Sequence, residues 1–377
     1  MPIPGSSSTT LETEGPEEGH KNSEPLIPGL PDEIAELCLF FLPYPYQALA
    51  RSVSSSWKRA ITDASFLIHK TALSLSLPYI FVLAFQESTA SFQWQSLDPR
   101  SRRWFALPPM PCPIAACQSG IACASLPRQG KLFVLGGNGV RSGAETTTHT
   151  TFVYSTSTNQ WSVASPLPFK GSFFAAGSIK GKIIAVGDSG SSTTDQITAA
   201  ERYDPESDTW TEAATLGMVL VRHDSAVVEN RLYVTEGWTW PFRYSPRGGV
   251  YDPDENRWRM MSKGMREGWS GLSVVLDGRL FVISEYGDCP MKVYVPDDDT
   301  WRYVGGKKLP REAMRRPFAV NGVEGSVYVV SRGLHAVVGK VFEGNNKKWE
   351  FRVEWEVLAA PETFNGFSPF NCQVLYG

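Results

Sequence analysis

The sequence predicts an all-β propeller of six blades, preceded by a small all-α domain and a disordered N-terminal tail. The first observation is that six of the 12 tryptophans recur at intervals of 57, 49, 48, 43 and 48 residues. A repeat of about 40–50 residues is typical of propeller blades. The second observation is the 33 glycines and 27 prolines among 377 residues, which favour many short elements joined by tight turns.

The first 24 residues are predicted to form a disordered tail. They are mainly serine, threonine, glycine, proline and glutamate, with almost no large apolar side chain. Such a segment cannot bury enough apolar surface to offset the entropy that it would lose on ordering. We therefore assign no structure to residues 1–24.

Residues 25–72 are predicted to form a helical hairpin or a three-helix unit. Pro31, Asp32 and Glu33 mark a helix start, since proline suits the first turn and acidic side chains favour its positive end. Helical spacing then groups two sets of apolar side chains: Ile34, Leu37, Cys38 and Phe41, followed by Leu49, Val53, Trp57 and Ile61. A unit of about 40 residues makes a marginal core, so part of this apolar surface should face a partner or the next domain.

Each predicted blade in residues 73–377 has the same pattern near its outer edge. A large apolar or aromatic residue stands seven positions before each periodic tryptophan, and turns such as Asp204-Pro205 and Asp252-Pro253 separate the two. The pattern predicts a strand, a tight turn and a strand that opens at the tryptophan. The six tryptophans expected to pack between blades are Trp104, Trp161, Trp210, Trp258, Trp301 and Trp349.

Short apolar runs, such as KLFVLGG at 131–137 and RLFVIS at 279–284, predict strands inside each blade. The runs are continuous, as expected for strands buried on both faces between stacked blades. With a strand-like stretch before most of them, the count is four strands per blade. The first blade lacks an opening strand and the chain ends in the strand-like FNCQVLYG, so this last strand should complete the first blade.

Composition argues against several classes of partner. The formal net charge is -3 without a long basic stretch, so neither nucleic acid nor an anionic membrane is expected as a partner. No apolar run approaches the ~20 residues of a membrane helix, and the N-terminus lacks a secretory signal pattern. The six cysteines include no C-x-x-C pair, which fits free thiols in a reducing compartment. We expect a protein of the nucleus or cytoplasm that is neither secreted nor membrane-spanning.

The repeated unit resembles the kelch repeat, and the helical segment, with Leu30-Pro31-Asp32-Glu33-Ile34, resembles an F-box. Stretches such as GLPDEIAELCL, SVSSSWK, QWQSLDP and TEGWTWPF extend the resemblance to plant F-box/kelch-repeat proteins over everything after the acidic tail. The resemblance implies an F-box at 25–72, a kelch propeller at 73–377 and a role in far-red light (phytochrome A) signalling.

The resemblance also implies a substrate-recognition subunit of an SCF-type (Skp-cullin-F-box) ubiquitin ligase. The F-box would dock on the Skp adaptor of a cullin-RING ligase, and the propeller loops would bind an unidentified target protein. The alternative is an interaction scaffold whose F-box contact has no ubiquitination outcome. Helix-in-groove docking would use F-box residues that could otherwise form a local core: Leu30, Pro31, Ile34, Leu37, Cys38, Leu42, Leu49, Val53 and Trp57.

Residues outside the blade pattern mark a predicted target-binding surface. Trp238 and Trp240 lie in the aromatic stretch WTWPFRY, where a loop after a second strand is expected. Arginine and tryptophan are enriched at binding hot spots. Residues near the openings of first strands complete the set: Arg222, Trp269, Arg315 and Arg316. Packing and ion pairs between blades would explain the same residues equally well.

No residue pattern predicts an enzyme, and we expect no cofactor and no bound metal. The five histidines are scattered, and no phosphate-binding G-x-x-x-x-G-K-[ST] loop is present. Kelch-type copper radical oxidases need a cluster of histidine and tyrosine with a linked cysteine, which so few histidines do not favour. The spacing of Cys112, Cys117 and Cys123 matches no common zinc site, so buried thiols are expected.

Overall fold

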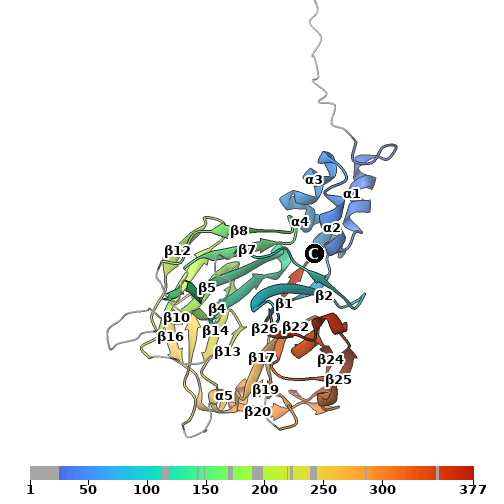
Figure 1. The fold of residues 1–377 in the computed structure, drawn as a ribbon. Helices are drawn as coiled ribbons and strands as arrows, with labels where there is room; N and C mark the ends of the chain where they lie inside the picture. Colours follow the sequence, from blue (N-terminus) through green and yellow to red (C-terminus); the bar gives the residue numbers. More distant parts are fainter. Residues whose placement is uncertain are drawn as a thin grey trace, which may run out of the picture.

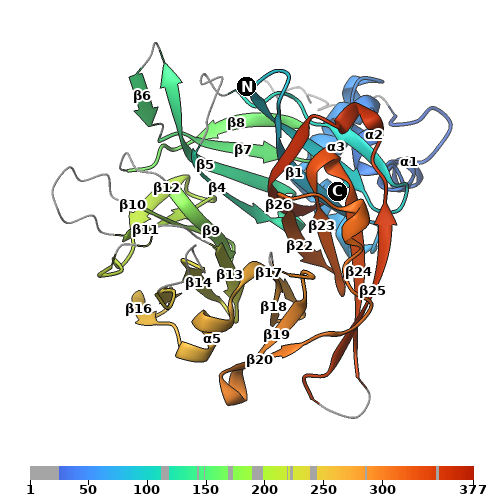
Figure 2. The ribbon, with the colours of Figure 1, turned by 60° about the horizontal axis from the view of Figure 1, so that its bottom comes forward.

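Six sheets form a ring, and a group of helices stands on one side of it (Figures 1 and 2). This arrangement, seen in a computed structural model, confirms the predicted fold class of a six-bladed propeller preceded by a small helical domain. The predicted tail, residues 1–24, lies outside the described residues. The structure describes residues 25–111, 119–141, 144–147, 149–168, 173–188, 198–218, 220, 224–237, 244–284, 287–344 and 348–377.

The helical domain contains four helices, which is one more than the larger predicted arrangement. They are α1 (Asp32–Phe40), α2 (Tyr44–Ala50), α3 (Ser55–Thr62) and α4 (Ala64–Ala72). Pro43 stands at the start of α2 and Pro45 lies in its first turn, so the proline that ends α1 also opens the next helix. Ser54 caps α3 by accepting a hydrogen bond from the Trp57 backbone N–H at 3.1 Å.

Each blade is an antiparallel sheet that runs from an inner strand at the propeller axis to an outer strand. The first two blades are β26 (Phe367–Tyr376), β1 (Pro78–Gln86), β2 (Ser91–Asp98) and β3 (Arg103–Ala106), then β4 (Ser119–Leu126), β5 (Lys131–Arg141), β7 (Thr151–Ser155) and β8 (Gln160–Ala164). The next two are β9 (Phe173–Ile179), β10 (Lys182–Asp188), β11 (Thr198–Asp204) and β12 (Thr209–Glu212), then β13 (Asp224–Val228), β14 (Arg231–Thr235), β15 (Gly248–Asp252) and β16 (Arg257–Met260). The last two are β17 (Gly271–Leu276), β18 (Arg279–Ser284), β19 (Met291–Val295) and β20 (Thr300–Tyr303), then β22 (Ala319–Val323), β23 (Ser326–Val330), β24 (Ala336–Glu343) and β25 (Phe351–Leu358).

Two blades carry an additional strand. In the second blade, β6 (Ala144–Thr147) extends β5 as a hairpin, and in the sixth blade, β21 (Gly305–Gly306) pairs in parallel with the outer strand β25. The remaining short elements in the described chain are α5 (Lys263–Gly268) and the 3₁₀ helices η1 (Pro127–Gln129), η2 (Pro296–Asp298), η3 (Arg311–Ala313), η4 (Arg332–Leu334) and η5 (Glu362–Phe364).

The last strand of the chain, β26, is the inner strand of the first blade. It pairs antiparallel with β1, with Leu375 opposite Tyr79, and so joins the two ends of the repeat array in one sheet. Side-chain amides also tie β26 to both neighbouring blades. Asn321 donates to the Cys372 carbonyl at 2.7 Å and Gln373 donates to the Cys123 carbonyl at 3.4 Å. The inner edge of β1 is therefore paired, and the ring is closed.

Hydrophobic clusters fill the spaces between neighbouring blades. Between the first and second blades, for example, Phe81 and Trp94 pack with Val134 and Tyr154. Comparable clusters of buried residues join each later pair of blades and close the ring between the sixth and the first. The continuous apolar runs of the sequence supply both faces of these sheets, as predicted for strands buried on two sides.

Four of the periodic tryptophans hold neighbouring blades together in the same way. Each ring packs on the tyrosine seven positions earlier, with centroids 5.0–5.4 Å apart. Each indole N–H also donates to a backbone carbonyl in the linker that enters its blade, at 2.7–3.0 Å. The four donor and acceptor pairs are Trp161 with Pro108, Trp210 with Ser165, Trp258 with Ala214, and Trp301 with Met265.

The sixth blade departs from the predicted tryptophan pattern. Trp355, which lies outside the period, donates its indole N–H to the Lys307 carbonyl at 3.0 Å and so takes the position that the other blades give to the periodic tryptophan. Trp349 lies before β25, has a left-handed φ of 68° and packs from the rim of the cluster between the fifth and sixth blades. Trp349, the predicted sixth blade marker, thus packs between blades as expected, while Trp355 makes the hydrogen bond to the linker. Trp104, in the first blade, packs on Phe364 with centroids 5.9 Å apart.

An asparagine or aspartate in the outer turn adds a second bond between blades. In the fourth blade, the Asn256 side-chain oxygen accepts the Tyr251 hydroxyl at 2.8 Å and the Ala214 backbone N–H at 2.9 Å. Asp208 and Asp299 accept equivalent pairs of bonds in the third and fifth blades. The linker between blades is thus held at a carbonyl by tryptophan and at an N–H by the turn residue.

Candidate protein-interaction surfaces

Because successive strands of a blade run in opposite directions, the connections divide between two sides of the ring. We call the side with the turns between first and second strands and between third and fourth strands the turn face; examples are 127–130, 156–159 and 253–256. The other side, which we call the loop face, carries the remaining connections, including 304–318, 331–335 and 359–366.

The helical domain has a small core of its own. Its buried residues are Leu39, Phe40, Ala50, Ile61 and Phe66. They come from all four helices. Lys70 is also buried, and its ammonium group donates to the Leu42 carbonyl at 2.8 Å, just past the end of α1. Burial lowers the pKa of Lys70 to about 8, and its place inside the domain makes it a structural residue.

A second set of apolar side chains in this domain points to solvent. These side chains are between 37% and 67% exposed, although they are as hydrophobic as the core. Ile34, Leu37 and Phe41 form one stripe along α1, because their spacing brings them to the same side of a helix. We call six of them the exposed F-box surface: Leu30, Ile34, Leu37, Phe41, Leu49 and Val53. Tyr46, Ile68 and Leu73 are the other exposed large apolar side chains of this domain. So much exposed apolar surface on so small a domain is typical of an interaction site.

Most residues predicted to bind the adaptor lie on or beside this surface. Pro31 and Cys38 are exposed next to it. Leu42 and Trp57 instead pack against the core of the helical domain, and the Trp57 indole donates to the Leu26 carbonyl at 2.5 Å. We leave these two residues out of the proposed surface. Phe41 was missing from the predicted set, although its spacing from Ile34 had already placed it on the same stripe.

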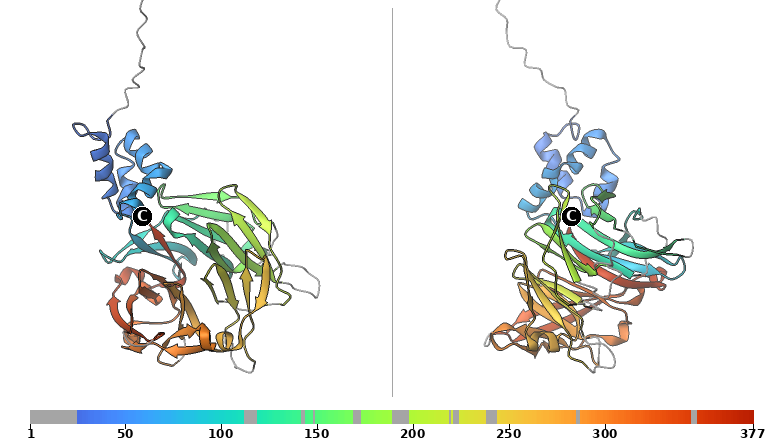
Figure 3. Two further views of the ribbon diagram at one scale, coloured as in Figure 1. Left: turned by 180° about the vertical axis from the view of Figure 1, so that it is seen from behind. Right: turned by 90° about the vertical axis from the view of Figure 1, so that its left-hand side faces the viewer.

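The helical domain is held on the turn face of the first two blades (Figures 1 and 3). The Tyr154 hydroxyl donates to Asn159 at 2.6 Å, so it accepts its bond with the Tyr44 hydroxyl of α2. Arg51 donates to the Thr158 carbonyl in the neighbouring turn. Burial raises the pKa of both Tyr44 and Tyr154. Both hydroxyls therefore keep their protons at neutral pH, and the chain of hydrogen bonds persists.

Backbone pairing strengthens the same contact. Leu77, in the segment that leaves α4, exchanges two hydrogen bonds with Gly377 at 3.0 and 3.2 Å. Tyr44 also packs against Tyr79 and Phe81 of β1, with ring centroids 5.1 and 5.7 Å apart. The exposed F-box surface takes no part in these contacts, so docking on the propeller leaves it open to another protein.

The predicted target-binding residues differ in their exposure to solvent where the structure describes them. Arg315 and Arg316 are exposed in the linker before β22. Trp269 is fully buried and donates its indole N–H to Asp224 at 2.8 Å. The prediction that Trp269 contacts a target is therefore wrong, because its ring packs between the fourth and fifth blades. Arg222, Trp238 and Trp240 lie outside the described residues.

The propeller axis encloses a channel of about 370 Å³ lined by the six inner strands. Several of its polar side chains bond to neighbouring blades. Asp224 accepts bonds from Trp269 and from the Ser273 backbone N–H, and the Ser273 hydroxyl donates to the Ser225 carbonyl at 3.3 Å. Asp224 and Ser273 therefore link neighbouring blades across the channel wall.

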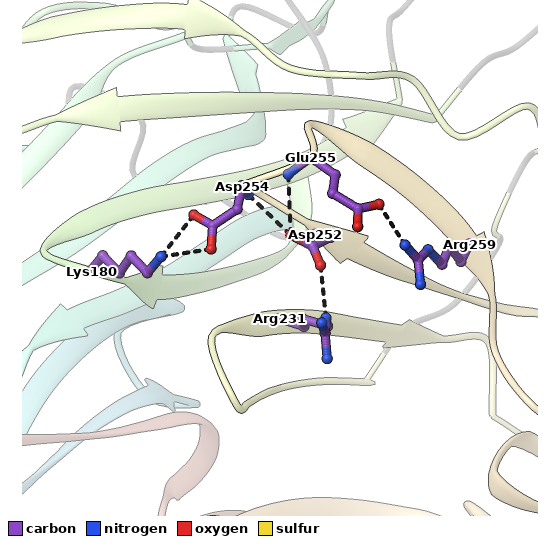
Figure 4. Close-up of polar contacts among 6 residues, drawn as sticks. All are labelled: Lys180, Arg231, Asp252, Asp254, Glu255 and Arg259. Carbon is purple, nitrogen blue, oxygen red and sulfur yellow. Dashed lines mark hydrogen bonds and ion pairs between the residues drawn. The ribbon is translucent and has the colours of Figure 1, made fainter.

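Charged residues in turns of the third and fourth blades are paired with one another on the turn face. Figure 4 shows the outer turn of the fourth blade, where Asp252 accepts from Arg231 at 2.8 Å and from the backbone N–H groups of Asp254 and Glu255. Lys180, in the turn of the third blade, bonds both carboxylate oxygens of Asp254 at 2.7 Å. Exposed ion pairs of this kind add little stability, but they engage the charged groups of these two turns with one another.

Two features of the described residues bear on other functions. No group of three or more histidine, cysteine, aspartate or glutamate side chains in it is arranged to hold a metal ion. Within the same residues, no helix has the length and apolar character needed to cross a membrane. Cys112 and Cys117 lie outside the described residues, and Cys123 is a buried thiol.

Sequence profiles of two domain types match this chain. The profile of the F-box domain matches residues 27–69, which span the four helices up to the middle of α4. The profile of the Kelch motif matches residues 122–168 and 170–217, which cover the second and third blades.

Proteins of Arabidopsis thaliana are similar over most of the chain. F-box protein AFR is 53% identical over 373 residues, which cover 98% of both chains. F-box/kelch-repeat protein At1g30090 is 38% identical over 354 residues, which cover 94% of this chain and 87% of that protein. F-box/kelch-repeat protein SKIP4 is 28% identical over 316 residues, covering 83% and 84% of the two chains.

Proposed function

The chain belongs to the F-box/kelch-repeat family, and from that premise we propose that it is the substrate-recognition subunit of an SCF-type ubiquitin ligase. The F-box binds a Skp-type adaptor, and the propeller binds a target protein through its loop face. The receptor itself forms and breaks no covalent bond. It raises the effective concentration of the target near a ubiquitin-charged enzyme carried elsewhere in the complex.

One observation carries the proposal: the six apolar side chains of the exposed F-box surface. Leu37 and Leu49 are exposed while Leu39 and Ala50, close to them in sequence, are buried. The domain thus has enough apolar residues for its core and presents a second set to solvent. An exposed apolar stripe on a short helix fits docking into a groove of a partner.

The first test is adaptor binding by the full chain with both Leu37 and Leu49 replaced by arginine. Both side chains are exposed, so the double variant should fold normally. We expect it to lose about 100-fold or more in affinity for a purified Skp-type adaptor, as for two residues at the centre of an interface. Ile68→Arg is the matched control, because Ile68 is 65% exposed on α4, outside the exposed F-box surface. Unchanged binding by the double variant would refute the proposal.

The alternative is a scaffold whose adaptor contact has no ubiquitination outcome. Turnover of captured partners separates the two functions. A receptor predicts that a bound partner becomes longer-lived on proteasome inhibition and in plants that carry the Leu37 and Leu49 double variant. A scaffold predicts no change in either case. The double variant is preferable to deleting residues 26–70, because deletion would uncover the propeller surface that Tyr44 covers.

The biological setting proposed from the sequence resemblance is far-red light signalling. Loss of the protein should then change seedling growth under far-red light while growth in darkness stays normal. The double variant should fail to restore the far-red response if adaptor binding is required. Equal responses of mutant and wild-type seedlings under far-red light would argue against this setting and leave the receptor function untouched.

A further inference from the structure

A pocket of about 670 Å³ opens on the loop face beside the sixth blade. The register of the sheet explains why three separate segments meet there. Ala319 pairs with Val330, and Ala336 pairs with Leu358, so the linker before β22, the turn 331–335 and the segment after β25 end at the same edge. The described residues that line the pocket include Glu312, Arg315, Arg332, Gly333 and His335.

Two arginines stand together in this lining. The Arg332 backbone N–H donates to the Arg315 carbonyl at 2.9 Å, which fixes the two residues side by side. Arg315 is exposed, and in the described chain no acidic group lies within ion-pair distance of its guanidinium. Arg332 is paired with Glu87 at the rim. Arg315 therefore offers its full set of donors, and Arg332 offers those that Glu87 leaves unused.

His335 adds a donor with a defined orientation. Its Nδ1 accepts the Ala360 backbone N–H at 3.2 Å, so the neutral ring carries its proton on Nε2. Gly333, with a left-handed φ of 78°, lies against that edge of the ring, and a Cβ there would come within 3.3 Å of Nε2. The glycine keeps this nitrogen uncovered beside the pocket.

We propose that this pocket binds an anionic side chain, a carboxylate or a phosphate, on an extended segment of the target protein. Planar guanidinium groups match both anions through paired hydrogen bonds, and His335 Nε2 supplies a further donor. Glu312 is the single acidic residue among the described lining residues, and the exposed Arg316 adds positive charge beside it. The proposal rests on the proposed function in that the ligand is part of a target protein, but the binding itself needs no adaptor.

The test measures binding of short fluorescein-labelled peptides to the purified full chain by fluorescence anisotropy at low salt. Three peptides share one sequence and differ at a central pair of residues, which are serine, glutamate or phosphoserine. We expect at least one anionic peptide to bind about tenfold or more tightly than the serine peptide, as for hydrogen bonds to charged groups. Binding of the glutamate peptide indicates a carboxylate ligand, and binding of the phosphoserine peptide alone indicates a phosphorylated target.

Variants decide whether the pocket is responsible. Arg315→Ala should lower the affinity for the anionic peptide about tenfold. Arg315→Lys should restore part of this affinity, because lysine keeps the positive charge. Arg352→Ala is the control, because Arg352 is an exposed arginine at the opposite end of β25. Equal affinity for all three peptides would overturn the proposal. So would equal losses in the Arg315→Ala and Arg352→Ala variants, since they would indicate bulk charge. Either result would leave adaptor binding, and hence the proposed function, unaffected.

Discussion

At the scale of single residues, several tryptophans are held in position by a hydrogen bond from the indole N–H as well as by packing of the ring. Trp210 and Trp258 each donate to a linker carbonyl at 2.9 and 2.7 Å, so the periodic residue is a hydrogen-bonding link between blades. Trp269, outside the period, satisfies its N–H with Asp224 inside the propeller. Most buried indole groups have such an acceptor, although the buried Trp94 indole has none among the described residues. Lack of periodicity therefore does not mark a tryptophan as a binding residue.

Glu201 is a residue whose burial should be visible in the pH dependence of stability. It is 3% exposed in β11, one carboxylate oxygen is without a hydrogen-bond partner, and it lies opposite Glu212 in the sheet. Burial first and the Glu212 charge second raise its pKa to about 7, from 4.5. The unfolded chain then releases this proton at lower pH than the folded chain. The free energy of unfolding should fall as the pH rises from about 4.5 to 7.

Glu201→Gln removes the charge and should therefore stabilise the protein at high pH. We expect a gain of about 1–2 kcal/mol at about pH 8 and less than half of that at about pH 5. Urea unfolding at the two pH values measures the difference. Glu206→Gln, at an exposed turn position in the same blade, should change little at either pH. A gain that does not depend on pH would contradict this explanation.

At the scale of elements, the outer turn of a blade fixes the linker that enters it. Asn256 accepts the Tyr251 hydroxyl and the Ala214 N–H with one oxygen, from a left-handed φ of 45°. Asn256→Ala loses both bonds and places alanine in a strained conformation, so we expect a loss of about 2–3 kcal/mol in the free energy of unfolding. Denaturant unfolding checks the value.

Asn256→Asp is the matched variant for these two hydrogen bonds. Aspartate keeps the acceptor oxygen and occupies the equivalent position in Asp208 and Asp299, both with a left-handed φ near 50°. We expect its stability to stay within about 1 kcal/mol of the wild type, since aspartate tolerates this conformation. If aspartate were as damaging as alanine, the two hydrogen bonds could not be the reason that this turn matters.

Some helices and strands could be predicted from the sequence alone, and others could not. Regular spacing predicted six blades, and the resemblance to F-box/kelch-repeat proteins is confirmed by the relatives. In the sixth blade Trp349 keeps the period and packs between blades, but the hydrogen bond to the linker comes from Trp355 of β25, which the period does not mark. The spacing of α1 residues placed Phe41 with Ile34, but only the packed helices distinguish exposed Leu37 from buried Leu39. The loop-face pocket is formed by three separate segments of the chain. No local sequence pattern could therefore predict it.

At the scale of the whole molecule, the helical domain and the propeller are built as one body. Tyr44 packs on Tyr79 and Phe81 and bonds Tyr154, while Leu77 pairs with Gly377. The exposed F-box surface and the loop face are thereby held in a fixed relation. A receptor needs this relation to present a bound target at a constant position with respect to the adaptor.

Tyr44→Ala should uncouple the two domains. Removing a buried aromatic side chain costs about 3–5 kcal/mol, and here the loss falls on the contact between domains. We expect one calorimetric unfolding transition for the wild type and two for the variant, the first from the small helical domain. Leu49→Ala, at a position 67% exposed on the same helix, should keep a single transition. Two transitions in the wild type would contradict a single rigid body.

The central claim is that the adaptor binds the exposed F-box surface and leaves the loop face free for a target. Hydrogen exchange of the full chain with and without a purified Skp-type adaptor tests it directly, because protection reports where a partner covers or orders the backbone. The account predicts slower exchange in residues 30–53 and unchanged exchange in 304–318, 331–335 and 359–366. Protection of those loop-face segments, or none in residues 30–53 when the adaptor is bound, would contradict it.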